Sequence, residues 1–168
     1  MAHPPTADLE ALLAALAEAG LEYIVVGGAA AVLHGAPVTT QDLDVVYRRS
    51  PDNLDRLESL LARVDAVARD PAGRHLRPNR SHLEAGGVLR LDTSLGPLDP
   101  MAKLHDGRGY DDLLSHSDTI DAEGLVLRVL DLPTLIEVKV AANRAKDRLM
   151  LPVLLALLAE RRRPSGNW

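Results

Sequence analysis

The chain has 168 residues, of which 46% are hydrophobic and 2% aromatic, and its formal net charge is −5. This length suits one domain with one core, built mainly from Leu, Val, Ala and Ile. The scarcity of aromatic rings argues against a stacking platform for single-stranded nucleic acid, and the negative charge means that any contact with nucleic acid must be local.

The sequence has no cysteine, which excludes disulfide bonds and thiolate metal sites. The N-terminus lacks the apolar region of a signal peptide, and the apolar run 149–158 is too short to span a bilayer. We therefore expect a cytoplasmic protein without membrane contact. Basic residues are nearly all arginine, and Ala and Leu are abundant, which is typical of a GC-rich bacterial genome.

The first predicted element is a helix over residues 7–19, with Thr6 as its cap and Gly20 at its end. Its leucines recur at helical spacing and form one apolar stripe: Leu9, Leu12, Leu13 and Leu16. Such a stripe predicts that the helix lies on a sheet.

A β-branched run at 24–26 predicts a short strand that stops at the pair 27–28, Gly-Gly. A helix over 29–33 is expected to start on these glycines and to end before Gly35 and Pro37. The free N–H groups and the partial positive charge of such a helix N-terminus suit a phosphate, and glycine lets the backbone approach closely.

The next predicted strand carries Asp42 and Asp44, with Leu43 between them. Side chains alternate faces along a strand, so the two carboxylates share one face while Leu43 enters the core. Two acids on one face repel each other, and folding alone gains nothing from this. A divalent cation would remove the cost, which predicts a metal site.

The order of apolar strand, Gly27-Gly28, helix and Asp42-x-Asp44 resembles the signature of the polymerase-beta-like nucleotidyltransferase superfamily. The resemblance implies an α/β (α+β) nucleotidyltransferase fold, with a mixed central sheet flanked by helices. It also implies that the glycine turn holds a nucleoside triphosphate and that the acids hold Mg²⁺, with Mn²⁺ as the alternative. The family commonly has Ser at the position of Gly28, so a hydroxyl contact to phosphate is missing here, and the gap from Gly28 to Asp42 is long for the family.

A helix is predicted after Ser50 and Pro51, and the segment 70–82 is predicted to be a loop because it holds Pro71, Gly73 and Pro78. This loop region is rich in Arg and His. We favour a solvated surface loop; the alternative is a local patch that binds triphosphate or an RNA backbone.

Two short strands are predicted over 88–94 and 97–101, and they contain Asp92 and Asp99. The resemblance implies a third carboxylate on a strand beside the Asp-x-Asp strand, where it acts as general base and contacts the metal. We choose Asp99. Asp92 is then expected to face outwards and to pair with Arg90, and Pro100 indicates a strand edge or a bulge.

The remaining elements are a short helix near 110–114, a hairpin that turns at Glu123 and Gly124, a helix capped by Asp131, and a last helix over 146–162. We expect one domain with a nucleotidyltransferase core (1–130), a helical segment packed on it (131–163) and a flexible tail (164–168).

A second constellation gathers two of the three lysines of the chain, Lys139 and Lys146, with Arg144 and Asp147. It resembles the corresponding pattern of AbiEii-type toxins and related short bacterial nucleotidyltransferases, which implies that the lysine contacts nucleotide phosphates. Lys139 and Asn143 would share a helix face. From the residues alone, Lys139 could equally pair with Glu137, Asp147 or solvent, and Asp147 could cap the last helix or orient Arg144.

These observations predict a magnesium-dependent nucleotidyltransferase of the EC 2.7.7 type, which moves a nucleoside monophosphate from a triphosphate to tRNA or to a protein. The expected site comprises Asp42, Asp44 and Asp99 for metal and catalysis, and the groups that bind nucleotide: Gly27, Gly28, Lys139, Arg144 and Lys146. A toxin–antitoxin or defence role is expected. The alternative is a nucleotide-binding or partner-binding, antitoxin-like module with degraded chemistry.

Overall fold

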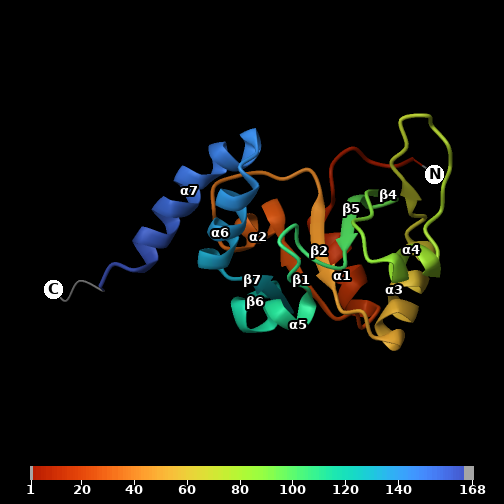
Figure 1. Ribbon diagram of the computed structural model, residues 1–168, viewed down its shortest axis with the longest axis horizontal. Helices are drawn as coiled ribbons and strands as arrows, with labels where there is room; N and C mark the ends of the chain where they lie inside the picture. Colours follow the sequence, from red (N-terminus) through yellow and green to blue (C-terminus); the bar gives the residue numbers. More distant parts are fainter. Residues whose placement is uncertain (1, 165–168) are drawn as a thin grey trace.

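The computed structural model describes residues 2–164, and within them the strands form a seven-stranded mixed sheet in the order β3-β4-β5-β2-β1-β7-β6 (Figure 1). The strands are β1 (Tyr23–Val26), β2 (Leu43–Tyr47), β3 (Val67–Ala68), β4 (Leu91–Thr93), β5 (Gly96–Met101), β6 (Ser117–Ala122) and β7 (Leu125–Leu130). Strand β2 pairs antiparallel with β1 and parallel with β5, and β1 also pairs parallel with β7. The predicted mixed α/β architecture is confirmed.

Helices flank the sheet: α1 (Leu9–Glu18), α2 (Gly27–Leu33), α3 (Pro51–Arg63), α4 (Arg80–Ala85), α5 (Tyr110–Leu113) with a 3₁₀ turn η1 (Leu114–His116), α6 (Leu132–Ala142) and α7 (Ala145–Arg161). Helix α6 packs between α2 and α7. Helix α7 extends away from the sheet towards the C-terminus (Figure 1). None of the helices in residues 2–164 is long and apolar enough to cross a membrane.

The core sits on the two central strands, because β1 and β2 are runs of β-branched residues covered on both faces. Ile24, Val25, Val45 and Val46 have no exposed surface. Such continuous apolar runs are typical of strands buried on both sides. The predicted leucine stripe of α1 joins this core through Leu12, Leu13 and Leu16.

Several local signals produce the predicted elements. The Ser50 side chain caps α3 and that of Asp131 caps α6, where its carboxylate accepts the Thr134 N–H at 2.8 Å. Glu123 and Gly124 both adopt positive φ in the turn between β6 and β7, as expected of a tight hairpin. The division of the domain at residue 130 stays a prediction, and residues 165–168 of the predicted tail lie outside the described part of the chain.

The predicted start of the first helix is wrong. Helix α1 begins at Leu9, and Asp8 rather than Thr6 is its cap, since the Asp8 carboxylate accepts the Ala11 N–H at 3.0 Å. The chain before it is held elsewhere: the Ala7 N–H bonds the Gln41 carbonyl at 2.8 Å. This tie to the segment before β2 keeps residues 6–8 out of the helix.

Two further expectations are corrected, one in the segment before β4 and one on β5. The predicted loop 70–82 ends early, because Asn79 forms a capping box with His82 and helix α4 starts at Arg80. Pro100 does not mark a sheet edge: β5 lies between β4 and β2. Strand β4 pairs only with residues 96–98 of β5, so Pro100 lies beyond that ladder and its missing N–H costs no β4 bond.

Candidate functional site

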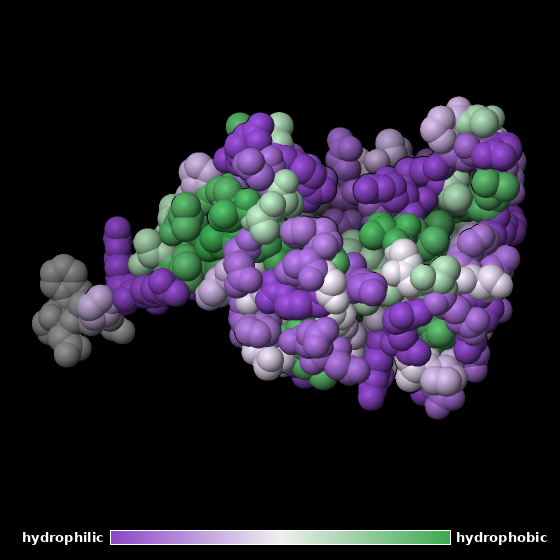
Figure 2. All heavy atoms as spheres, viewed as in Figure 1, coloured by the Kyte–Doolittle hydropathy of each residue, from purple (hydrophilic) through white to green (hydrophobic). Residues whose placement is uncertain are grey.

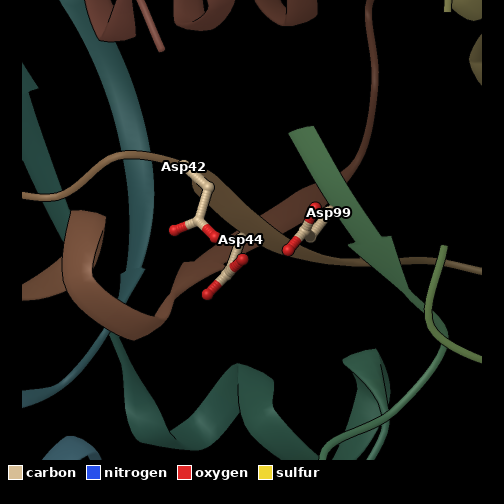
Figure 3. Close-up of side chains that lie close together, drawn as sticks. All are labelled: Asp42, Asp44 and Asp99. Carbon is tan, nitrogen blue, oxygen red and sulfur yellow. The ribbon is translucent and has the colours of Figure 1, made fainter. Parts of the chain in front are cut away.

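Three carboxylates converge at one end of the central strands. One oxygen from each of Asp42, Asp44 and Asp99 lies within 4.8 Å of the others. Figure 3 shows the three side chains gathered at this point. Asp44 of β2 is in register with Asp99 of the parallel strand β5, and neighbours in register place their side chains on the same face. Asp42 lies one residue before β2, so only Asp44 of the predicted pair is inside the strand.

Burial makes the charge on Asp44 costly. Burial, and secondly the negative charge of Asp42, raise the pKa of Asp44 to about 6, against the opposing effect of Lys146, Arg90 and Arg144. A carboxylate whose ionisation is disfavoured by burial and by a like charge gains most from a bound cation. The local electrostatics of the pair therefore favour a metal ion, as the sequence predicts.

Asp99 is in a different state, because arginines contact it. It is 3% exposed, its Oδ1 accepts a hydrogen bond from Arg69 Nη2, and Arg90 Nη1 lies 3.8 Å from Oδ2. Asp42 and Asp44 form no ion pair within residues 2–164. The cluster thus contains one carboxylate neutralised by the protein and two that are not.

The structure distinguishes the two candidates for the third acid by their position and by their arginine partners. Asp99 joins the cluster, whereas Asp92 does not. The predicted partner of Asp92 is wrong: Arg69 Nε lies 3.6 Å from its Oδ1, and Arg90 turns to Asp99. Arg69 follows β3, a strand that the sequence analysis did not predict, and so its position next to β4 and β5 was not expected.

The glycine turn touches the acid cluster directly. Gly27 has φ +65°, and a Cβ atom added to it would lie 2.4 Å from Asp44 Oδ2. A Cβ atom on Gly28 would lie 2.7 Å from Thr40 Oγ1. Both distances are below any normal contact, so neither position accepts a side chain without displacement of its neighbour.

A cleft of about 540 Å³ opens over the cluster. Of the predicted site residues, all except Gly28 line it. It is also lined by cations that the sequence analysis did not select, Arg90 and Lys103, and by apolar side chains such as Met101 and Leu135. All three lysines of the chain, Lys103, Lys139 and Lys146, line this one cleft, and the rarity of lysine was the signal that could have identified Lys103.

Lys139, Arg144 and Lys146 form the cationic wall of the cleft. Asp147, which has no exposed surface, holds two of these cations. Its carboxylate accepts Arg144 Nε at 2.7 Å and the Arg144 backbone N–H at 3.1 Å, and it pairs with Lys139 Nζ at 3.3 Å. Burial opposes ionisation of Asp147, but these contacts outweigh it and its pKa lies below the ordinary value. Asp147 is therefore the protein partner of Lys139, and it both caps α7 and orients Arg144.

The structure bears on two further expectations, one at the end of α6 and one in the segment 70–82. Asn143 is the C-cap of α6 in the left-handed conformation, φ +50°, and its N–H bonds the Lys139 carbonyl at 3.0 Å, so it lies one turn after Lys139 at the end of the helix. The arginines of the segment 70–82 are neutralised locally, in the pairs Arg74–Asp70, Arg77–Asp65 and Arg80–Glu84. These pairs favour the solvated surface over the anion patch.

Two solved structures share this fold. A candidate nucleotidyltransferase from Thermotoga maritima aligns with a TM-score of 0.51 and 18% identity over 88% of this chain and 90% of its own. ANT(2″)-Ia in complex with adenylyl-2″-tobramycin aligns with a TM-score of 0.57 and 15% identity over 91% of this chain and 89% of its own. No family model and no curated protein matches the sequence. At these identities the likeness concerns the fold, which is that of the nucleotidyltransferase neighbours.

Proposed function

We propose that this chain is a magnesium-dependent nucleotidyltransferase of the EC 2.7.7 type, which transfers a nucleoside monophosphate from a triphosphate to tRNA or to a protein, within a bacterial toxin–antitoxin or defence system. One observation carries the proposal: Asp42, Asp44 and Asp99 converge at a cleft whose other wall is cationic. The fold shared with nucleotidyltransferases supports the reaction class.

The donor set fits a hard divalent cation, because it consists of carboxylate oxygens close enough to share one ion. Asp42 and Asp44 would hold Mg²⁺ or Mn²⁺, and Asp99 would complete the set. When bound, the ion neutralises the phosphates and the charge that develops in the transition state. The raised pKa of Asp44 supports this assignment, since the cation compensates a charge that the fold itself leaves uncompensated.

The remaining predicted site residues would bind the phosphates. The amide of Gly27 and the charges of Arg144 and Lys146 line the cleft and would hold them, with the amide of Gly28 beside the cleft and Lys139 behind them on Asp147. The acceptor hydroxyl attacks the α-phosphorus, its proton passes to a carboxylate, and pyrophosphate leaves. Asp99 is the candidate base. Arg69 donates to its Oδ1, whereas Arg90 Nη1 stays 3.8 Å from its Oδ2, beyond hydrogen-bond distance, so Oδ2 would take the proton.

A labelling assay tests the proposal. The intact protein is incubated with Mg²⁺ and each α-labelled nucleoside triphosphate, with and without total tRNA or a cell extract. Label on RNA supports tRNA as the acceptor, and label on a polypeptide supports a protein. Asp44→Ala should abolish transfer without lowering the melting temperature; full activity in this variant contradicts the catalytic assignment.

A second candidate function is supported by α7. Figure 2 shows hydrophobic side chains gathered over this helix, and Leu149 and Leu155 are 80% and 51% exposed. The apolar run 149–159 carries no charge, and basic side chains outnumber acidic ones on both sides of it. Before it stand Arg144, Lys146 and Arg148 with Asp147, and after it Arg161, Arg162 and Arg163 with Glu160. Like charges at both ends disfavour pairing of α7 with a second copy of itself. They suit an acidic partner protein, antitoxin-like, with an apolar docking segment.

The two functions give different results. A binding module with degraded chemistry retains nucleotide binding but leaves no label on any acceptor. An enzyme that is controlled by a partner labels its acceptor, and the acidic partner inhibits it. Leu149→Glu should block the partner in both cases without a change in the melting temperature, because this side chain packs against little else.

A further inference from the structure

Asp42 differs from the other two carboxylates in what holds it. Asp44 and Asp99 are fixed by the sheet, since they lie side by side in the register of β2 and β5. Asp42 precedes β2 and has no place in that ladder. A metal ligand must be held close to one geometry to be effective, so another group has to restrain Asp42.

Thr40 supplies that restraint. Its hydroxyl donates to the Asp42 backbone carbonyl at 3.0 Å and lies 3.4 Å from Asp42 Oδ1. One short side chain thus contacts both the backbone and the carboxylate of the residue two positions ahead. Such a local hydroxyl bond replaces the ladder bonds that Asp42 lacks.

The glycine turn adds a second constraint on the same hydroxyl. A Cβ atom on Gly28 would lie 2.7 Å from Thr40 Oγ1 and 3.0 Å from Thr40 Cβ. Any side chain at position 28 must therefore push Thr40 away, and with it the group that restrains Asp42. Gly28 and Asp42 are coupled through Thr40 although they lie on different elements.

We infer that Thr40 is a positioning residue for Asp42, and that position 28 is glycine in this chain because the Thr40 hydroxyl fills the space where a side chain would stand. This inference rests on the proposed function, since it assigns Asp42 to a metal. It extends that function by naming a residue outside the carboxylate cluster on which the metal affinity depends.

The test measures Mn²⁺ binding by the intact protein, by electron paramagnetic resonance titration of the free ion. Thr40→Val removes the hydroxyl and keeps the shape, and we expect about tenfold weaker Mn²⁺ binding, the usual effect of losing a group that orients a ligand. Thr40→Ser restores the hydroxyl and should bind within about twofold of the wild type. Both variants should melt close to the wild type; Thr40→Ala replaces Thr40→Val if the latter is unstable.

A double-mutant cycle tests the coupling. Gly28→Ala should weaken Mn²⁺ binding in the wild-type background by about as much as Thr40→Val does. In a Thr40→Gly background, where no hydroxyl remains to be displaced, Gly28→Ala should have little further effect. Additive effects of the two substitutions would overturn the coupling.

The outcomes separate this inference from the proposed function. If the wild type binds Mn²⁺, Asp44→Ala does not, and Thr40→Val binds as the wild type does, then Thr40 has no positioning role while the metal site stands. If the wild type itself binds no Mn²⁺, both the metal site and the role of Thr40 are refuted.

Discussion

Asp44 and Asp99 lie directly opposite each other on two parallel strands, yet their charges are balanced in different ways. Arg69 contacts Asp99, whereas Asp44 is left beside Asp42 with a pKa raised to about 6. The protein thus neutralises Asp99 internally and leaves Asp42 and Asp44 without an ion-pair partner among the described residues. The consequences of this asymmetry can be measured.

The raised pKa of Asp44 makes the metal-free protein less stable at neutral pH. Its pKa is 3.8 when unperturbed and about 6 in the folded state, so the native state binds the proton more tightly than the unfolded state does. The stability that the protonated Asp44 contributes is fully present below pH 3.8 and is lost as the pH rises from there through about 6. Asp44→Asn should raise the melting temperature of the metal-free protein by a few degrees at about pH 8 and have little effect near pH 4. Calorimetry at both pH values checks this, and an equal shift at both contradicts it.

Metal binding should show the opposite dependence on pH. The cation needs the ionised carboxylate, so Mn²⁺ affinity should fall as the pH drops through about 6, the pKa of Asp44. Calorimetric titration between about pH 8 and pH 5 measures the change. A flat profile would show that Asp44 is not a ligand.

Gly27→Ala should damage the site more than its backbone strain explains. The residue has φ +65°, and its new Cβ would meet Asp44 Oδ2 at 2.4 Å. Gly20 provides the matched control, because it has φ +68° and nothing lies within 4 Å of its added Cβ. Both variants should lose roughly 1–2 kcal/mol from the left-handed conformation. Only Gly27→Ala should also lose Mn²⁺ binding, as titration would detect, and equal binding by the two variants contradicts this assignment.

Arg69→Gln should make the protein more dependent on metal. The substitution leaves Asp99, 3% exposed, without its main counter-charge and should lower stability. The Arg69 side chain is 33% exposed, so the loss should be smaller than for a fully buried pair. A bound cation would compensate this charge, so Mg²⁺ should raise the melting temperature of the variant more than that of the wild type. Arg74→Gln, in an exposed pair with Asp70, is the control. An identical Mg²⁺ response in wild type and Arg69→Gln would place Asp99 outside the metal site.

Substitution of Lys139 should mainly lower stability, whereas substitution of Lys146 should mainly weaken nucleotide binding. Lys139 is buried on Asp147, whereas Lys146 is exposed at the same cleft. Lys139→Met leaves Asp147 without one of its two cations and should lower the free energy of unfolding by about 2–4 kcal/mol in urea. Lys146→Met should leave unfolding unchanged and weaken nucleotide binding several-fold, measured with a fluorescent triphosphate. Equal nucleotide affinity in Lys146→Met and the wild type would remove this lysine from the proposed phosphate site.

The sequence alone determined most of the elements and their order, because the signals for them are local; β3 and α4 were not predicted. The Gly27-Gly28 stop, the Ser50 and Asp131 caps, and the turn at Glu123-Gly124 each act within a few residues. The alternation of Asp42 and Asp44 around a buried Leu43 is equally local, so the acid pair could be predicted without coordinates.

Only the tertiary structure decided which groups meet across the chain. That Arg69 contacts Asp99 and that Lys103 joins the cleft depend on sheet register and packing between segments distant in sequence. That Asp147 pairs with Lys139 depends on the angle at which α7 folds back on α6. Local propensity carries no information about such pairings, since their energy arises only when the strands are already aligned. For the same reason the sequence could show that position 28 is glycine, but only the fold places the Thr40 hydroxyl above it.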